Sequence, residues 1–505
     1  MEDVHWLDDA TIEFLSYFVR TILAEENKQY PIALIATQRP ESLPAQIGDV
    51  GMQVLEIGKL SPSGISELAA NILGAPISAS LQKLLETRAN GNPFFAEQIV
   101  RFLFEQGSLS LHEDGKYYAS QQAQTSLPTD VRAVLIARLD QLSQHVRETV
   151  QTASVLGREF ELRLLAQMLR EDLELPQKVK RAEKANIWTP LTEIEYLFRH
   201  ALLRDAAYSM QLQSRQRELH NLALSAMLTL YADDLEPHYG ELAFHSERAG
   251  INDKAQIYLT LAGRAAADAY QNSLALDYFI RALGVVPEND KRSKLDLLFD
   301  RALIYGRLGN RPAQLVDLDS LESISEQLGG VHAQARACLL RADFFFTTSE
   351  FSQAIESAQR GMDLAQSIGD VEVALDAFRL IPLSLWRQGK LAEAMQFARS
   401  GLDIVQSIGR KLDEGSIYNT IGLIALEQKE SNTAQEYFGK ALSLAREIPD
   451  RTLETKALNN LGNYEGFIRG DYARAREYYE QSSACLLYTS PSPRDRTRSR
   501  MPSSA

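Results

Sequence analysis

The sequence predicts a mainly α-helical fold with a partial α/β domain at its N-terminus, a small domain of helices and a β-hairpin, and then a long helical solenoid. Three observations predict this arrangement. Residues 32–36 form an apolar run without alternation, which is typical of a strand buried on both faces. Helical spacing after residue 126 gives way to a hairpin pattern at residues 188–200. In the C-terminal half, alanine recurs at intervals of 40, 40 and 41 residues, at Ala354, Ala394, Ala434 and Ala475.

The composition excludes several classes of protein. A formal net charge of −14 and a pI near 5.2 argue against a nucleic-acid partner, because phosphate binding needs a concentrated basic surface. The two cysteines, Cys338 and Cys485, are too few for a disulfide framework or a thiolate metal site. No apolar run approaches the roughly 18 residues that a membrane span needs. We therefore expect a cytoplasmic protein with no membrane or nucleic-acid partner.

Two adjacent carboxylates, Glu2 and Asp3, stand at the start of the chain. In nucleotide-hydrolysing α/β domains, one carboxylate of such a pair holds Mg²⁺ through water and the other orients the attacking water. An amphipathic helix is predicted over residues 9–26. The apolar strand that follows ends in Thr37 and Arg39. Ligands of open α/β sheets bind beyond the carboxyl ends of the strands, so these two side chains should point where the carboxylates point.

The motif Gly-Asn-Pro-Phe-Phe at residues 91–95 closes one predicted helix and opens another. Gly91 can take the left-handed conformation that ends a helix, and Pro93 suits the first turn of the next. A second short strand is predicted at residues 54–57, ahead of a helix over residues 63–73. Alone, the motif would be an ordinary helix joint; beside the preceding motifs, we interpret it as part of a nucleotide-binding domain.

In this order, the motifs resemble those of AAA+/STAND signalling ATPases, in the branch fused to class III adenylate/guanylate cyclases or protein kinases and followed by helical repeats. The resemblance implies that Glu2 and Asp3 are the Walker B pair, which binds Mg²⁺ in the intact parent. It places Thr37 and Arg39 in the sensor 1 segment, and Pro93 in an element that packs near the nucleotide base.

The sequence departs from this family because it contains no G-x-x-x-x-G-K-[ST] loop. Without that loop, no backbone N–H groups cradle the phosphates and no lysine meets their charge. We therefore predict a chain cut inside a nucleotide site, which neither binds nor hydrolyses ATP by itself. ATP or ADP and Mg²⁺ would be cofactors of the intact parent only.

The middle segment combines helices with a small hairpin, which is a winged-helix pattern. Many such domains read DNA, but acidic residues surround the predicted recognition helix, so we interpret the domain as a lid over the nucleotide. His200, at the end of the hairpin, could then sense a phosphate; the alternative is a capping or core histidine. His238 and His245 lie seven residues apart, and for lack of a third ligand we expect a packed surface pair rather than a metal site.

The C-terminal half matches the residue pattern of tetratricopeptide repeats. One 40-residue unit has aromatic, apolar and small residues at the expected positions: Tyr418, Ile421, Gly422, Ala434, Phe438 and Ala441. An earlier unit has the corresponding set: Gly263, Ala275, Phe279, Ala282 and Pro287. We expect five to six units, one of them irregular around residues 302–329. Such arrays present a concave surface to a peptide or partner domain and carry no chemistry of their own.

From Cys485 the sequence becomes rich in serine, proline and arginine, and it resembles the translation of a transposon-type sequencing adapter. The alternative is a natural disordered tail. The predicted boundaries are 1–60 for the α/β part, 61–125 for a helical lid, 126–205 for the winged-helix-like domain, 206–250 for a helical linker, 251–484 for the repeats and 485–505 for the tail.

Two functions of different classes fit these observations. The first is a fragment of a multidomain signal-transduction ATPase, with a cyclase or kinase output domain upstream of Met1 and a protein or peptide bound by the repeats. This resemblance also allows oligomerisation of the intact parent. The second is a stand-alone interaction scaffold with a degenerate ATPase remnant. Part of a transcriptional activator is a further alternative.

Overall fold

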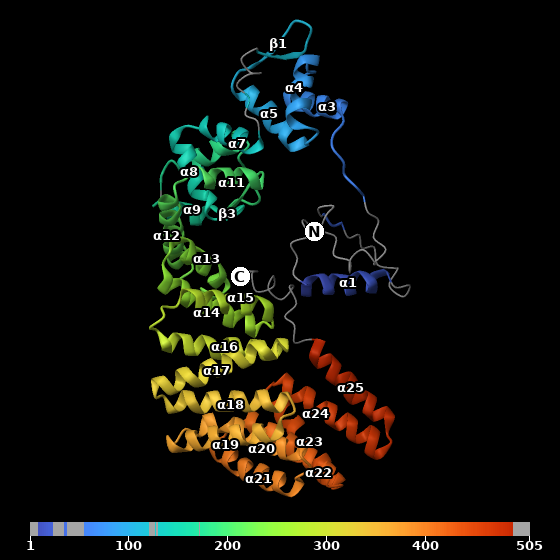
Figure 1. Ribbon diagram of the computed structural model, residues 1–505. Helices are drawn as coiled ribbons and strands as arrows, with labels where there is room; N and C mark the ends of the chain where they lie inside the picture. Colours follow the sequence, from blue (N-terminus) through green and yellow to red (C-terminus); the bar gives the residue numbers. More distant parts are fainter. Residues whose placement is uncertain are drawn as a thin grey trace, which may run out of the picture. The chain divides into compact units, whose positions relative to one another are not determined.

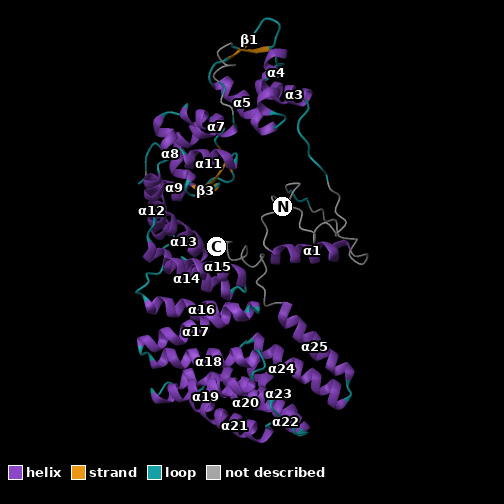
Figure 2. Cartoon of the chain, in the orientation of Figure 1, coloured by secondary structure: helices purple, strands orange, loops and turns teal. Residues whose placement is uncertain are grey.

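The computed structural model describes residues 9–23, 35–37, 55–120, 127, 130–170 and 172–487. The chain divides into two compact units, Met1–Gln141 and Leu142–Ala505. Helices predominate in both units, and the strands are short (Figure 2). No helix in the described ranges is both long and apolar enough to cross a membrane.

The first unit contains a small helical bundle and a β-hairpin. Its fully buried core includes Leu81, Leu85, Ile99 and Leu103. The hairpin, within the segment predicted as a helical lid, was missed by the sequence reasoning because its strands have only three residues each. The elements are α1 (Asp9–Leu23), α3 (Pro62–Leu73), α4 (Ala79–Ala89), α5 (Pro93–Glu105), β1 (Leu109–Leu111), β2 (Tyr117–Ala119) and α7 (Val131–Asp140).

The predicted parallel strands are not found where the structure describes these segments. Residues 35–37 and 55–57 have no regular secondary structure, and Ile35 and Leu55 are 77% and 83% exposed. A buried parallel strand needs neighbours that pair its backbone and cover both faces. Both sheets among the described residues are antiparallel, so they offer no such neighbours. The prediction of a buried strand was therefore wrong for residues 35–36, and so was the prediction of a short strand for residues 55–57. The helix predicted from residue 9 is confirmed as α1.

The second unit begins with helices around a three-stranded antiparallel sheet. The predicted hairpin is confirmed, since Trp188 pairs with Phe198, and a third strand extends the sheet in the order β3-β5-β4. The rings of Phe160 and Trp188 lie 5.1 Å apart in its core. The elements are α8 (Gln144–Ser154), β3 (Glu159–Glu161), α9 (Leu162–Met168), α10 (Leu175–Lys184), β4 (Trp188–Pro190), β5 (Glu195–Phe198), α11 (Ala201–Ser209), α12 (Gln213–Leu230), η3 (Glu236–His238) and α13 (Tyr239–Ala249).

The rest of this unit is an array of six consecutive helix pairs, from α14 to α25 (Figure 1). The elements are α14 (Asn252–Asp268), α15 (Asn272–Val285), α16 (Lys291–Leu308), α17 (Arg311–Leu328), α18 (Val331–Thr347), α19 (Phe351–Ser367), α20 (Val371–Arg387), α21 (Leu391–Ile408), α22 (Lys411–Glu427), α23 (Ser431–Glu447), α24 (Arg451–Asn463), η4 (Tyr464–Arg469) and α25 (Tyr472–Leu487).

The helix pairs form a curved stack. The first helices α18, α20, α22 and α24 pack against one another in succession, whereas the second helices pack mainly against the first helices of their own and the following pair. The closer approach of the first helices places them on the inner face of the array. The surface formed by the first helix of each pair, from α14 to α24, is called the inner face.

The recurring alanines are buried at the helix crossings. Ala354, Ala394 and Ala434 are fully buried, and Ala475 is 4% exposed. The last interval has 41 residues because η4 is a π-helical turn, which accommodates one extra residue in a helix. The helix α25 continues through Leu487, so it includes the first three residues of the segment assigned to the tail.

Candidate functional site

The structure brings no nucleotide site together from the residues that it describes. Glu2, Asp3 and Arg39 lie outside the described residues. Thr37 is exposed in backbone without regular structure, and Pro93 is exposed as the first residue of α5. Within the described ranges, no group of three or more histidine, cysteine or acidic side chains is placed to hold a metal ion. The described residues alone assemble no site for a nucleotide with Mg²⁺, and we derive no step of nucleotide chemistry from them.

The Gly-Asn-Pro joint has the predicted local geometry. Gly91 has a φ of +77°, and a Cβ added there would lie 2.7 Å from the Cβ of Lys59. The amide of Leu60 donates a hydrogen bond of 2.8 Å to the Gly91 carbonyl oxygen. The Asn92 side chain caps α5 by accepting from the Phe95 amide at 3.1 Å. Residues 59–60 are therefore held close to the start of α5, and only glycine fits at position 91.

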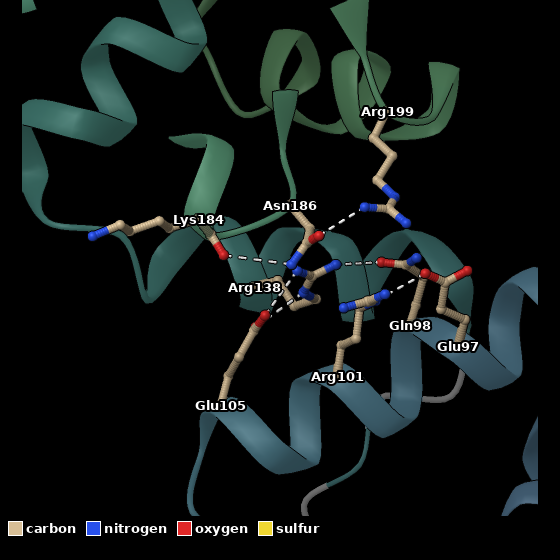
Figure 3. A network of polar contacts seen from close by, with 8 residues as sticks. All are labelled: Glu97, Gln98, Arg101, Glu105, Arg138, Lys184, Asn186 and Arg199. Carbon is tan, nitrogen blue, oxygen red and sulfur yellow. Dashed lines mark hydrogen bonds and ion pairs between the residues drawn. The ribbon is translucent and has the colours of Figure 1, made fainter. Parts of the chain in front are cut away.

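A buried arginine joins α5 to α7 in the first unit (Figure 3). Arg138 is 3% exposed, and its guanidinium donates to both carboxylate oxygens of Glu105, at 2.8 and 3.0 Å. A third donor reaches the side-chain oxygen of Gln98 at 2.5 Å. This bidentate pair compensates the buried charge and fixes the two helices relative to each other. Its role is structural, and the sequence reasoning missed it.

The histidines of the linker are arranged differently from the prediction. His245 is buried against His220 of α12, with the two Nδ1 atoms 2.9 Å apart, while Tyr208 contacts Nε2 of His220 at 3.1 Å. His238 instead stacks on Tyr231. The predicted surface pair was therefore wrong, because α12 supplies a closer partner. Burial lowers the pKa of His220 to about 3 and that of His245 to about 4, so the pair is neutral near pH 7.

His200 directly precedes α11, at the position of a helix cap. It is half-buried, with extended backbone, and its side chain makes no capping hydrogen bond. Nearby, Arg199 donates to the side chain of Asn186 at 2.7 Å (Figure 3). The phosphate-sensing role of His200 stays a prediction.

The inner face of the repeat array carries an open cavity of about 550 Å³. Its apolar floor comes from the first helices α16, α18 and α20, with Phe299, Leu303, Leu339, Leu340 and Val373. Leu303 is 46% exposed, although it is a large aliphatic side chain. Charged side chains surround this floor: Arg336, Asp343, Glu372, Asp376, Arg379 and Arg410, with His332 beside them.

Most charges around this cavity are paired with one another. Arg379 lies 3.1 Å from Asp343 and 3.5 Å from Asp376. Arg410 lies 3.3 Å from Glu372. Farther along the inner face, the Asn460 side-chain amide donates to Asn419 at 2.8 Å. The result is a groove with an apolar floor, a charged rim and side-chain amides.

The sequence reasoning placed a partner on this surface but named none of these side chains. The signal was available, because Arg336, Asp376, Ser416 and Lys456 occupy one repeat position at 40-residue intervals. A repeat register based on the small core residues does not identify the residues that point into the groove.

Comparisons by sequence support the repeat assignment. Residues 413–487 match the family described as tetratricopeptide repeat. An uncharacterized protein from Rhizobium meliloti (strain 1021) is 26% identical over 340 residues, which cover 64% of this chain and 32% of that protein. The chain thus spans about a third of the length of the curated relative that it matches.

Comparisons by structure add a likeness of fold. A Signal Transduction ATPase with Numerous Domains (STAND) protein with a tetratricopeptide repeat sensor, from Pyrococcus horikoshii, superposes with a TM-score of 0.53 at 15% identity, covering 98% of this chain and 69% of that one. The apo quorum sensor NprR from B. thuringiensis gives a TM-score of 0.42 at 13% identity, covering 81% and 99%. We base no inference on the second likeness. The chain is a tetratricopeptide-type helical repeat protein whose fold resembles that of the STAND protein.

Proposed function

We propose that this chain is the switch and sensor portion of a STAND-type signal-transduction ATPase, and that its repeat array binds a protein or peptide on the inner face. The groove across α16, α18 and α20 carries this proposal. It leaves Leu303 exposed between charged side chains, and an exposed aliphatic floor with a polar rim is typical of a surface that buries a partner's side chain.

The order of domains supports the switch part of the proposal. The succession α8-β3-α9-α10-β4-β5 with the sheet order β3-β5-β4 supports a winged-helix-like domain between the N-terminal part and the repeats. We propose that this domain is the lid of the ATPase and that occupancy of the array is transmitted to it through α12 and α13. Output would come from a cyclase or kinase domain of the parent, by analogy with the family only.

Nucleotide binding belongs to the parent in this proposal. Glu2 and Asp3 would serve as its Walker B pair, while Thr37, Arg39, Pro93 and His200 would approach the nucleotide. ATP or ADP with Mg²⁺ would supply the free-energy difference between two states of the switch. The phosphate loop is not in this sequence, so the chain by itself is proposed to act only through its binding surface.

A stand-alone scaffold is the second candidate function. It is favoured by the described N-terminal residues, which assemble no nucleotide site. Genomic DNA upstream of Met1 separates the two candidates. An open frame that encodes G-x-x-x-x-G-K-[ST] supports the ATPase, and an in-frame stop codon supports the scaffold.

A peptide-display selection tests the binding surface. Random 12-residue peptides displayed on phage are selected against the full chain and then compared on two variants, Leu303→Glu on the inner face and Ile280→Glu on α15. Both side chains are 46% exposed, so the two substitutions are matched in burial. We expect enriched peptides to bind the Ile280→Glu chain and to lose binding to the Leu303→Glu chain. Equal binding to both variants, or no enrichment, would refute binding on the inner face.

A further inference from the structure

Arg336 is the cation around the cavity that lacks a carboxylate. Its guanidinium lies 4.3 Å from the ring centroid of Phe299, and within the described residues it makes no ion pair. Of the carboxylates that also surround the cavity, Asp343 and Asp376 share Arg379, and Glu372 is paired with Arg410. Nearby on α16, Asp300 is paired with Arg264 at 2.8 Å, and the charge of Arg336 acts on Asp300 without an ion pair between them. Arg336 therefore presents its hydrogen-bond donors to the open groove.

Lys456 is a second exposed cation, three repeats farther along at the same repeat position. Partial desolvation in the groove, and then the charge of Arg379, lower the pKa of Lys456. Asp450 and Asp343 act in the opposite direction. Lys456 lies on α24, which packs against α22 of the inner face. Among the ion pairs of the described chain it has none, and a ligand carboxylate would favour its charged form.

Asp376, which is paired with Arg379, and several uncharged polar groups lie between these two cations. Ser416 occupies the same repeat position on α22, and the amides of Asn419 and Asn460 hydrogen-bond to each other on the inner face. Such amides can accept from and donate to the main chain of an extended peptide. Packed helices lie about 8–10 Å apart, so Arg336 and Lys456 are separated by up to about 30 Å, which an extended peptide spans with up to about nine residues.

We infer that the inner face selects an extended peptide in which an apolar side chain enters the cavity beside Phe299 and Leu303 and carboxylates pair with Arg336 and Lys456. This inference rests on the proposed function, because it specifies the chemistry of the partner for the same surface. The overall charge of −14 makes the preference notable, since long-range repulsion opposes an acidic ligand and only local cations can attract it.

Three labelled peptide sets test this preference by fluorescence anisotropy with the full chain. Each 12-residue peptide carries one central leucine or phenylalanine, flanked on both sides by aspartate and glutamate, by lysine and arginine, or by serine and asparagine. We expect the acidic set to bind most tightly. Arg336→Glu and Lys456→Glu should each weaken its binding by about 3- to 10-fold. Arg399→Glu, on the second helix α21, is the matched control and should leave binding unchanged.

A double charge reversal distinguishes recognition from a general loss of structure. The chain with both Arg336→Glu and Lys456→Glu should prefer the basic set, while its thermal unfolding midpoint stays at that of the native chain. The inference is overturned if the acidic set binds all variants equally, or if the basic set binds the native chain best. Binding of neutral or basic peptides that Leu303→Glu abolishes would refute the acidic preference and leave the proposed function intact. Failure of every set and of the display library would refute both.

Discussion

Phe438 occupies the space that a side chain on Gly422 would need. A Cβ at Gly422 would lie 2.5 Å from Cε1 of Phe438, closer than nonbonded carbon atoms approach. The same relationship recurs in the first pair of the array, where a Cβ at Gly263 would lie 2.6 Å from the ring of Phe279. A glycine on the first helix and an aromatic ring on the second thus set the helix crossing in two separate repeats.

Gly422→Leu is predicted to overpack this crossing. The fully buried Phe438 ring has no free volume to move into, so the substitution should lower the free energy of unfolding by roughly 1–3 kcal/mol. The measurement is urea unfolding followed by circular dichroism. Gly439→Leu is the matched control, because Gly439 is exposed on α23 and an added Cβ meets no atom within 4 Å. Equal stability of the two variants would contradict the repeat register.

The regular repeats were predictable because the same helix crossing recurs in each repeat and requires a small residue at the same position. The unit formed by α16 and α17 did not match the repeat pattern, because its helix crossing uses different residues. Gln314 stands where other repeats have alanine, and Gly306 makes room for it, since a Cβ there would lie 2.8 Å from the Gln314 side chain. Arg301 forms a bidentate pair with the buried Asp317. Such compensating pairs lie on different helices, and a single periodic pattern cannot reveal them.

Removal of Glu105 is predicted to destabilise the first unit more than removal of Arg138. Glu105→Ala leaves the guanidinium of Arg138 buried without its carboxylate, which should cost on the order of 3 kcal/mol. Arg138→Met removes the buried charge itself and should cost less, because the partly exposed Glu105 can be hydrated. Chemical unfolding of both variants measures the difference. Arg132, which is exposed on α7, is the control, and Arg132→Ala should change stability by less than about 0.5 kcal/mol.

The full chain is predicted not to bind ATP or ADP with micromolar affinity in the presence of Mg²⁺. The physical reason is the missing phosphate loop, whose backbone amides and lysine supply most of the phosphate contacts in such domains. Isothermal titration calorimetry with each nucleotide measures this directly. Saturable heat with one site per chain would contradict the prediction and would point to a phosphate site that the sequence motifs do not identify.

Sequence motifs predicted local geometry better than they predicted a site. The left-handed Gly91 and the cap before α5 follow from residue type alone. In contrast, His220 and His245 are 25 residues apart in the sequence and lie on different helices, so no spacing rule predicts their contact. The inner-face cavity likewise depends on how three helices from successive repeats are stacked. Residues that meet only through tertiary packing were therefore the ones missed.

The pair of His220 and His245 is predicted to make stability depend on pH. Both pKa values are lowered in the folded chain, to about 3 and about 4, mainly because burial disfavours the charged form. The unfolded chain binds protons on these side chains below pH ~6.5. The contribution of these two histidines to the free energy of unfolding is therefore fully present above that pH, and it is lost as the pH falls toward the folded pKa values. Arg204 and Arg248 add to this effect, because their positive charges also oppose protonation of His220.

Urea unfolding at pH 7.5 and pH 5 measures this dependence. For His245 alone, the loss between pH ~6.5 and pH 5 should be roughly 2 kcal/mol, at about 1.4 kcal/mol per pH unit. His245→Phe should remove that share of the pH dependence, although the variant is less stable at pH 7.5 because His220 and Tyr208 lose part of their polar network. His112, which is exposed in the first unit, provides the control in His112→Phe. Equal loss of stability by His245→Phe and the native chain on acidification would contradict this prediction, because the lowered pKa of His245 would then contribute no pH dependence.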